Sequence, residues 1–164
     1  MTTRVMLVDD AIVVRHILTD TLAKESDIDV VGTAADGVQA MEKLPSLNPD
    51  VVILDVEMPK MDGIETLAAI KKHNPRIKVI MFSTLTSRGA DATMDALMLG
   101  ADDYVTKPAN VGSMSAAIDR IRAELVPKIK ALHRSGRSDP SRQSTTNPTA
   151  PDINVFRVPP ARQR

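Results

Sequence analysis

The chain has 164 residues, of which 43% are hydrophobic, enough to build the core of one ordinary domain. Aromatic residues make up only 2% and Trp is absent, so a platform for stacking bases or sugars is almost excluded. The formal net charge is zero and Cys is absent, which argues against nucleic-acid or membrane partners and rules out disulfides and thiol chemistry. Because no signal-peptide pattern and no apolar run of membrane-spanning length occurs, we expect a cytoplasmic protein.

Short apolar runs rich in β-branched residues predict five strands, in chain order 5–8, 30–33, 51–54, 79–82 and 104–106. Three of these runs are continuously apolar, as expected for parallel strands that are covered on both faces. The stretches between them have helical spacing, as Val14, Ile17 and Leu18 illustrate. Five strands that alternate with five helices predict a doubly wound α/β sandwich with a parallel sheet.

The composition of the chain changes near residue 133. Residues 134–164 contain six Arg and two Asp, a net charge of +4, whereas the preceding residues carry −4. Residues 135–151 are rich in Ser, Thr, Asn, Gly and Pro and have almost no apolar side chain. We therefore expect one domain over residues 1–133, followed by a flexible basic linker or tail over residues 134–164.

Side chains able to do chemistry follow four of the five predicted strands. They are Asp9 and Asp10 after the first strand, Asp55 after the third, Ser83 after the fourth and Lys107 after the fifth. In an open parallel sheet these positions converge on one edge, where ligands bind. Three neighbouring carboxylates repel one another, and Mg²⁺ (or Mn²⁺) would offset that charge while leaving room for phosphate oxygens. Asp55 would then be the nucleophile in phosphoryl transfer, with Lys107 and Ser83 as cationic and hydroxyl partners.

Each of these residues alone also has a purely structural interpretation. An Asp-Asp pair after a strand, such as Asp9 and Asp10, often serves as a helix N-cap. Asp55 could begin a turn, Lys107 could lie in a solvated loop, and Ser83 could be a hydrogen-bonded core hydroxyl. Their joint occurrence, in this order and at one edge of the sheet, favours the functional interpretation.

Three segments carry a family resemblance: VMLVDDAIVVRHIL, VVILDVEMPKMDGIETL and GADDYVTKP. They resemble the three signatures of the receiver domain of two-component response regulators, over residues 1–132 of this chain. The resemblance implies a flavodoxin-like fold with strand order 2-1-3-4-5. It also implies that Asp55 accepts a phosphoryl group from a sensor histidine kinase, and that Lys107 pairs with the phosphoryl oxygens.

The same resemblance implies a metal site. Asp9, Asp10 and Asp55 would hold Mg²⁺ together with the backbone carbonyl of Glu57.

The resemblance further implies the parts of a switch. Ser83 matches the switch hydroxyl, and the adjacent Thr84 is the less favoured candidate. Tyr104 matches the switch aromatic, and the Lys107–Pro108 peptide bond is expected to be cis.

Two segments are more specific than a general receiver. Ser83 to Gly89 and Lys107 to Ser113 resemble the chemotaxis protein-glutamate methylesterase family, although Ala11 to Val13 stand where that family is usually serine-rich. In that family a linker joins the receiver to a C-terminal serine-hydrolase domain, which removes methyl groups from glutamyl esters on chemoreceptors and is regulated by phosphorylation. We therefore expect the receiver either of such a methylesterase or of a stand-alone regulator that acts by binding a partner.

The chain itself lacks the hydrolase. No Gly-x-Ser-x-Gly motif in a strand–turn–helix context is present, and His16, His73 and His133 do not stand beside a plausible serine nucleophile. This chain is therefore expected to bind and carry a phosphoryl group without being the esterase.

Two other functions share some of these residues. A small Mg²⁺-dependent phosphohydrolase would use the same nucleophile but needs a second acid or base, for which Asp62 and Glu57 are the only nearby candidates, and a substrate cap that the chain lacks. An interaction module could bind metal at the acidic cluster without phosphorylation, but the presence of both Lys107 and Ser83 argues against it. Scattered Arg residues in the tail are expected to be mainly solubilising.

Overall fold

The computed structural model describes residues 2–84, 87–108 and 112–135, with the backbone alone for residues 87–89 and 135. In this part of the chain five parallel strands form one sheet in the order β2-β1-β3-β4-β5. The strands are β1 (Thr3–Val8), β2 (Ile28–Ala34), β3 (Val51–Asp55), β4 (Lys78–Ser83) and β5 (Asp103–Thr106). Each contains the run that the sequence predicts, so the expected sheet and its order are confirmed.

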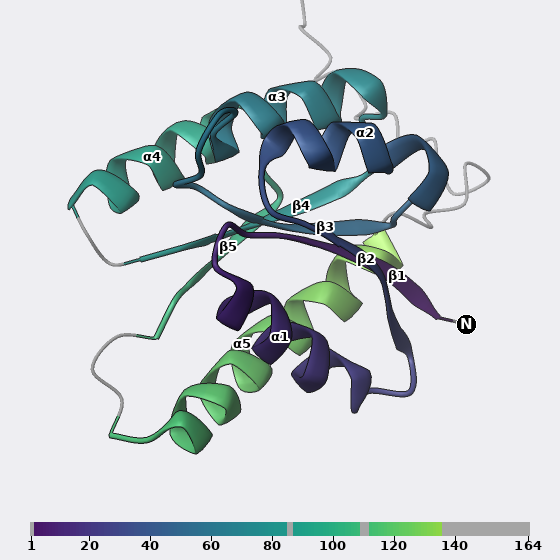
Figure 1. Cartoon of the computed structure of the whole chain (residues 1–164). Coiled ribbons are helices and arrows are strands. Elements are labelled where there is room, and N and C mark those ends of the chain that lie inside the picture. Colours follow the sequence, from purple (N-terminus) through teal and green to yellow (C-terminus); the bar gives the residue numbers. More distant parts are fainter. Residues whose placement is uncertain (1, 85–86, 109–111, 136–164) are drawn as a thin grey trace, which may run out of the picture.

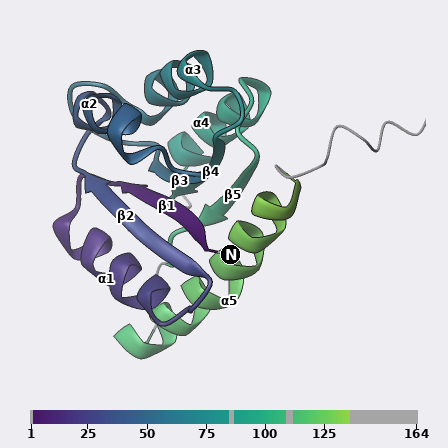
Figure 2. The ribbon, with the colours of Figure 1, turned by 90° about the vertical axis from the view of Figure 1, so that its right-hand side faces the viewer.

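The helices cover both faces of this sheet. They are α1 (Ile12–Ala23), α2 (Gly37–Leu47), α3 (Gly63–His73), α4 (Ser87–Met98) and α5 (Met114–Ser135). Figure 1 shows α1 and α5 on one face and α2, α3 and α4 on the other, and the rotated view in Figure 2 agrees. The doubly wound flavodoxin-like fold with five helices is therefore confirmed in the described residues. None of these helices combines the length and the apolar character needed to cross a membrane.

The central strand β3 is buried on both faces along its whole length. Alternate side chains of a strand point to opposite faces, so Ile53 packs in the core beneath α1 and α5, and Leu54 in the core beneath α2, α3 and α4. Burying each such side chain contributes about 1.5–3 kcal/mol. Asp55 is the last residue of this strand, so two well-packed cores hold its backbone in place.

The starts of α1 and α3 show which acidic side chains serve as helix caps. Helix α1 begins after Ala11 without a side-chain cap, so neither Asp9 nor Asp10 is its N-cap. Helix α3 begins with a capping box: the Asp62 side chain accepts a hydrogen bond from Glu65 N at 2.9 Å, and the Glu65 side chain accepts one from Asp62 N at 3.1 Å. The carboxylate of Asp62 is therefore engaged in holding the helix start.

Two prolines lie within helices, and the peptide bond before Pro108 differs from its prediction. Pro45 and Pro127 lie inside α2 and α5. Helix α5 continues past Pro127, and Ile129 beyond it is fully buried in the core. The residues that the structure describes contain no cis peptide bond, so the prediction of a cis Lys107–Pro108 bond is wrong. The trans form is the lower in energy for most X–Pro bonds, and Lys107 reaches the carboxylates of Asp9 and Asp55 with the trans bond.

The predicted boundary between domain and tail falls within the last helix. Helix α5 runs to Ser135, two residues beyond the predicted end at residue 133. The rest of the predicted tail, residues 136–164, lies outside the described residues. The flexible linker therefore stays a prediction.

Gly63 lies against the backbone of the strand end that carries Asp55. Its N–H donates a 2.9 Å hydrogen bond to Val56 O, and an added Cβ would lie 2.7 Å from Val56 Cα and still closer to the carbonyl oxygen of Asp55. We expect Gly63→Ala to lower the free energy of unfolding by about 2–3 kcal/mol, because backbone atoms cannot yield as a side chain can. Urea denaturation measures this loss.

The matched control is Gly112→Ala, because an added Cβ at Gly112 would meet no atom of the described residues within 4 Å. We expect this change to alter the free energy of unfolding by less than about 0.5 kcal/mol. Equal stabilities of the two variants would contradict the close packing described for Gly63.

Candidate functional site

The structure brings the three predicted carboxylates together. Asp9 follows β1 and Asp55 ends β3, and these strands are neighbours in the sheet. One carboxylate oxygen from each of Asp9, Asp10 and Asp55 lies within 4.8 Å of the other two. Asp9 and Asp55 are 2% and 4% exposed, whereas Asp10 is exposed to solvent. The site is therefore an acidic cluster, with two buried members and one open to water.

Lys107 is the counter-charge of this cluster. Its Nζ atom lies 2.8 Å from Asp9 Oδ2 and 3.1 Å from Asp55 Oδ1. The backbone places it there, because Lys107 N donates a 2.7 Å hydrogen bond to the carbonyl oxygen of Ser83 at the end of β4. Burial by itself would lower the pKa of Lys107, but its contacts with Asp9 and Asp55 raise that pKa above its usual value. Lys107 is therefore positively charged at neutral pH.

Asp55 is held in an environment that opposes its ionisation. Burial raises the pKa of Asp55 to about 7, Lys107 opposes this rise, and the negative charges of Asp9 and Asp10 add to it. Without a further cation, part of the Asp55 population is protonated at neutral pH. A divalent cation beside the carboxylates would favour the ionised form, which is the form that can act as a nucleophile.

The donor set fits Mg²⁺. Asp9 Oδ2 is buried and has no hydrogen-bond partner among the described residues; Lys107 is its ion-pair partner. From the part of the chain that the structure describes, Asp55 Oδ1 accepts only a long hydrogen bond, of 3.4 Å, from Glu57 N in addition to its contact with Lys107. Oxygen ligands of this kind, few in number and with open space beside them, are what Mg²⁺ takes in phosphoryl-transfer sites. Asp9, Asp10 and Asp55 could hold the ion; the predicted role of the Glu57 carbonyl stays a prediction.

A cavity of about 220 Å³ opens beside the cluster. Its lining comprises Asp10, Asp55, Glu57, Ser83, Thr84 and Lys107. All six were singled out from the sequence. A group bound in this cavity would contact the predicted nucleophile, the predicted cation and the predicted hydroxyl at the same time.

The predicted switch residues occupy different surroundings. Ser83 is 7% exposed, and its Oγ lies 2.9 Å from Oγ1 of Thr93 on α4. Thr84 is exposed. Tyr104 on β5 is 47% exposed and does not line the cavity. The Ser83 hydroxyl is therefore hydrogen-bonded to α4, whereas Tyr104, the predicted switch aromatic, lies outside the cavity.

Two residues near the site were not found from the sequence. Arg15 on α1 donates from Nη1 to the carbonyl oxygen of Asp9 at 2.7 Å, which ties the helix to the loop that carries the carboxylates. Thr93 holds the hydroxyl of Ser83. Arg15 lies one helical turn beyond Ala11, a spacing that could have suggested a contact with this loop; nothing in the sequence pairs Thr93 with Ser83.

The acid or base that a phosphohydrolase needs is not supplied by Asp62. Its carboxylate caps α3, and it lines a neighbouring cavity with Asp10 and Glu57 rather than the one that contains Asp55. Among the residues that line the Asp55 cavity, Glu57 alone remains as a candidate for that role.

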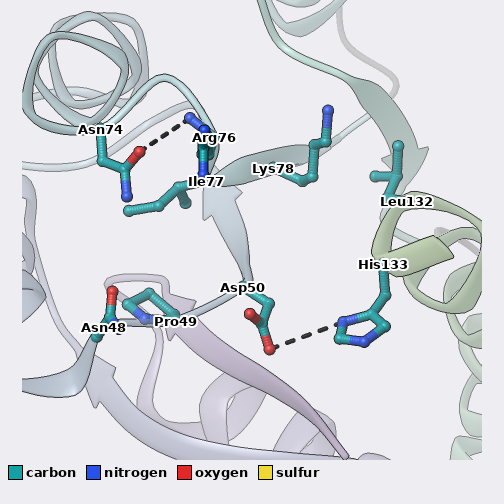
Figure 3. Close-up of a pocket in the computed structure, with 9 residues that line it drawn as sticks. All are labelled: Asn48, Pro49, Asp50, Asn74, Arg76, Ile77, Lys78, Leu132 and His133. Carbon is teal, nitrogen blue, oxygen red and sulfur yellow. Dashed lines mark hydrogen bonds and ion pairs between the residues drawn. The ribbon is translucent and has the colours of Figure 1, made fainter. Parts of the chain in front are cut away.

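Another cavity of about 220 Å³ lies at the opposite edge of the sheet, between the starts of β3 and β4 and the end of α5 (Figure 3). Figure 3 shows Asp50 and His133 facing each other, with 3.7 Å between Asp50 Oδ2 and His133 Nδ1. The other lining residues are Asn48, Pro49, Asn74, Arg76, Ile77, Lys78 and Leu132. The lining holds one carboxylate and no Ser, Thr or Cys, so it offers neither a metal cluster nor a hydroxyl or thiol nucleophile to His133.

Comparison with known sequences shows a family match and close relatives. A family model described as the response regulator receiver domain matches residues 5–119. A protein-glutamate methylesterase/protein-glutamine glutaminase from Nocardioides sp. is 52% identical over 129 residues, which cover 79% of this chain and 35% of that protein. A protein of the same description from Trichodesmium erythraeum is 52% identical over 132 residues, covering 80% of this chain and 38% of that protein. The chain thus spans little more than a third of these relatives.

Solved structures agree with the sequence matches. The response regulator domain of Thermotoga maritima CheB is 41% identical, with a TM-score of 0.72, and the match covers 82% of this chain and 98% of that domain. A chain of the CheX-CheY-BeF3-Mg+2 complex from Borrelia burgdorferi is 32% identical, with a TM-score of 0.60, over 74% of this chain and 87% of that one. The first similarity covers a whole regulatory domain.

Proposed function

Because this chain belongs to the response regulator receiver domain family, we propose that it is a switch operated by phosphorylation of Asp55 by a histidine kinase. One observation carries the proposal: Asp55, the last residue of the central strand, shares a cavity with Lys107 and Ser83 and a carboxylate cluster with Asp9 and Asp10. A nucleophile, a cation, a hydroxyl and a site for Mg²⁺ are what phosphoryl transfer to a carboxylate requires.

In the proposed reaction, an Asp55 carboxylate oxygen forms a bond to the phosphorus of a phosphohistidine. The bond from phosphorus to the imidazole nitrogen breaks, and the imidazole leaves with the electron pair. Lys107 Nζ, 3.1 Å from Asp55 Oδ1, offsets negative charge on the transferred group. Mg²⁺ held by Asp9, Asp10 and Asp55 would supply the remaining charge neutralisation.

Phosphorylation would then change the contacts of Ser83. Its hydroxyl lies 2.9 Å from Thr93 in α4, and turning toward the phosphoryl oxygens would alter this link between β4 and α4. Tyr104 would change rotamer in response. The surface affected is apolar, since Met94, Met98 and Leu99 at the end of α4 are all more than half exposed.

We propose that this surface regulates a methylesterase output domain in a chemotaxis protein. The support is the similarity to methylesterases of which this chain spans 35–38%, and to the regulatory domain of a CheB. A chemotaxis histidine kinase would be the phosphodonor, chemoreceptors the indirect targets and the cytoplasm the location. The alternative is a stand-alone receiver that acts through a binding partner. The size of the native protein, detected with an antibody against residues 1–133, distinguishes them: a band larger by at least a domain supports the methylesterase.

Incubation of the chain with radiolabelled acetyl phosphate tests the phosphorylation itself. We expect Mg²⁺-dependent labelling that approaches one phosphoryl group per chain and is lost in a chelator. Release of phosphate far beyond one equivalent, faster than the labelled protein decays, would instead support a phosphohydrolase. Metal binding without any labelling would support an interaction module.

A further inference from the structure

Lys128 on α5 makes three contacts at the edge strand β5. Its Nζ atom lies 2.9 Å from Asp103 Oδ1, 2.9 Å from the carbonyl oxygen of Tyr104, and 5.3 Å from the centre of the Tyr104 ring. Asp103 Oδ1 also accepts a 2.8 Å hydrogen bond from Tyr104 N. The ammonium group is thus fixed by two oxygens and lies over the aromatic ring.

The position of Tyr104 makes this contact specific to one side-chain conformation. Within the described residues, β5 is at the end of the sheet and pairs only with β4, and Tyr104 on this strand is 47% exposed. The two oxygen contacts hold Lys128 in place whichever way the ring points, since one is a backbone carbonyl and the other belongs to Asp103. Only the ring contact is lost when Tyr104 turns away from Lys128.

We propose that Lys128 is a positioning residue of the switch, which holds Tyr104 in its outward conformation before phosphorylation. This inference rests on the proposed function, because it assumes that phosphorylation changes the Tyr104 rotamer. A contact present in only one of two conformations shifts their populations toward that conformation by its own free energy. Lys128 therefore sets how readily the surface formed by α4, β5 and α5 changes in the unphosphorylated protein.

The sequence provides a direct probe, because Tyr104 is the only Tyr and Trp is absent. Labelling with 3-fluorotyrosine gives a single ¹⁹F resonance that reports the surroundings of this ring. We expect Lys128→Met, which keeps the length of the stem but removes the charge, to raise the inward-to-outward ratio about twofold to fivefold in the unphosphorylated protein. Beryllofluoride is an analogue of the phosphoryl group, and in the proposed switch its binding favours the inward conformation. Its affinity should therefore rise by a similar factor when the outward conformation predominates in the free protein.

Three controls separate this role from a general effect on folding. Lys130→Met removes another α5 lysine, which pairs with Glu25 and Asp27 and does not contact Tyr104, and should leave the ratio unchanged. Lys128→Arg keeps a cation over the ring, and this variant should behave as the wild-type protein does. In a Tyr104→Leu background, Lys128→Met should no longer change beryllofluoride affinity, measured from the ¹⁹F signal of the bound fluoride; a merely structural Lys128 would still change it.

The outcomes distinguish failure of this inference from failure of the proposed function. If beryllofluoride with Mg²⁺ does not bind the wild-type chain, or binds without altering the Tyr104 resonance, the switch itself is refuted. If the wild-type resonance responds but Lys128→Met behaves as wild type and as Lys130→Met, the role of Lys128 is refuted. An effect of Lys128→Met that persists in the Tyr104→Leu background also overturns it.

Discussion

The variant Asp55→Asn should lose phosphoryl labelling by at least about a thousandfold, the order of loss that follows removal of a nucleophile. An amide cannot form the acyl phosphate, and the change also removes one of the three carboxylates that could hold Mg²⁺. The protein should stay folded, because burial raises the pKa of Asp55 and the ionised carboxylate is costly at this position. Labelling with radiolabelled acetyl phosphate, alongside thermal denaturation, measures both effects.

Asp29→Asn is the matched control, since Asp29 is an exposed aspartate on β2, away from the predicted site residues. It should be labelled as well as the wild-type chain. Stoichiometric labelling of Asp55→Asn at another residue would refute the role of Asp55.

The second large effect is expected at Lys107. Lys107→Met should lower the free energy of unfolding of the metal-free protein by about 3 kcal/mol at pH 8. The reason is that Lys107 is the ion-pair partner of both Asp9 and Asp55, at 2.8 Å and 3.1 Å, and its removal leaves their charges buried without it. Labelling should also slow, because no ammonium group would offset the charge of the phosphoryl oxygens.

The loss should depend on pH. Burial raises the pKa of Asp55 to about 7, above the value of about 4 in an unfolded chain. A carboxyl group with a raised pKa favours the folded state while it is protonated, and this contribution is lost as the pH rises through about 7. Lys107 opposes the rise, so without it the Asp55 pKa increases further. The deficit of the variant should therefore be smaller at pH 5 than at pH 8.

Urea denaturation at both pH values, with a chelator and then with Mg²⁺, measures this dependence. At pH 8, Mg²⁺ should restore part of the lost stability, because it replaces the ammonium group as the counter-charge. Lys72→Met, which removes an exposed lysine on α3, should change stability little at either pH. An equal deficit at pH 5 and pH 8, with no response to Mg²⁺, would contradict the electrostatic account.

The sequence by itself determined the fold and which of the candidate residues gather at one edge of the sheet. Apolar runs such as residues 51–54 are typical of buried strands, and their alternation with helices favours a parallel sheet. The ends of parallel strands lie at one edge, so Asp9, Asp55 and Lys107 could be placed together although up to 98 positions separate them. The structure confirms that placement. It could be predicted because it follows from chain direction alone and needs no knowledge of side-chain packing.

Only the tertiary structure decided the contacts that helices make across the fold. The bonds from Thr93 to Ser83, from Arg15 to the Asp9 carbonyl and from Lys128 to Tyr104 depend on how each helix is rotated and shifted against the sheet. The apolar period of a helix specifies which face is buried but not which polar side chain meets which partner. The raised pKa of Asp55 has the same origin, since burial and the surrounding charges exist only after the elements have packed.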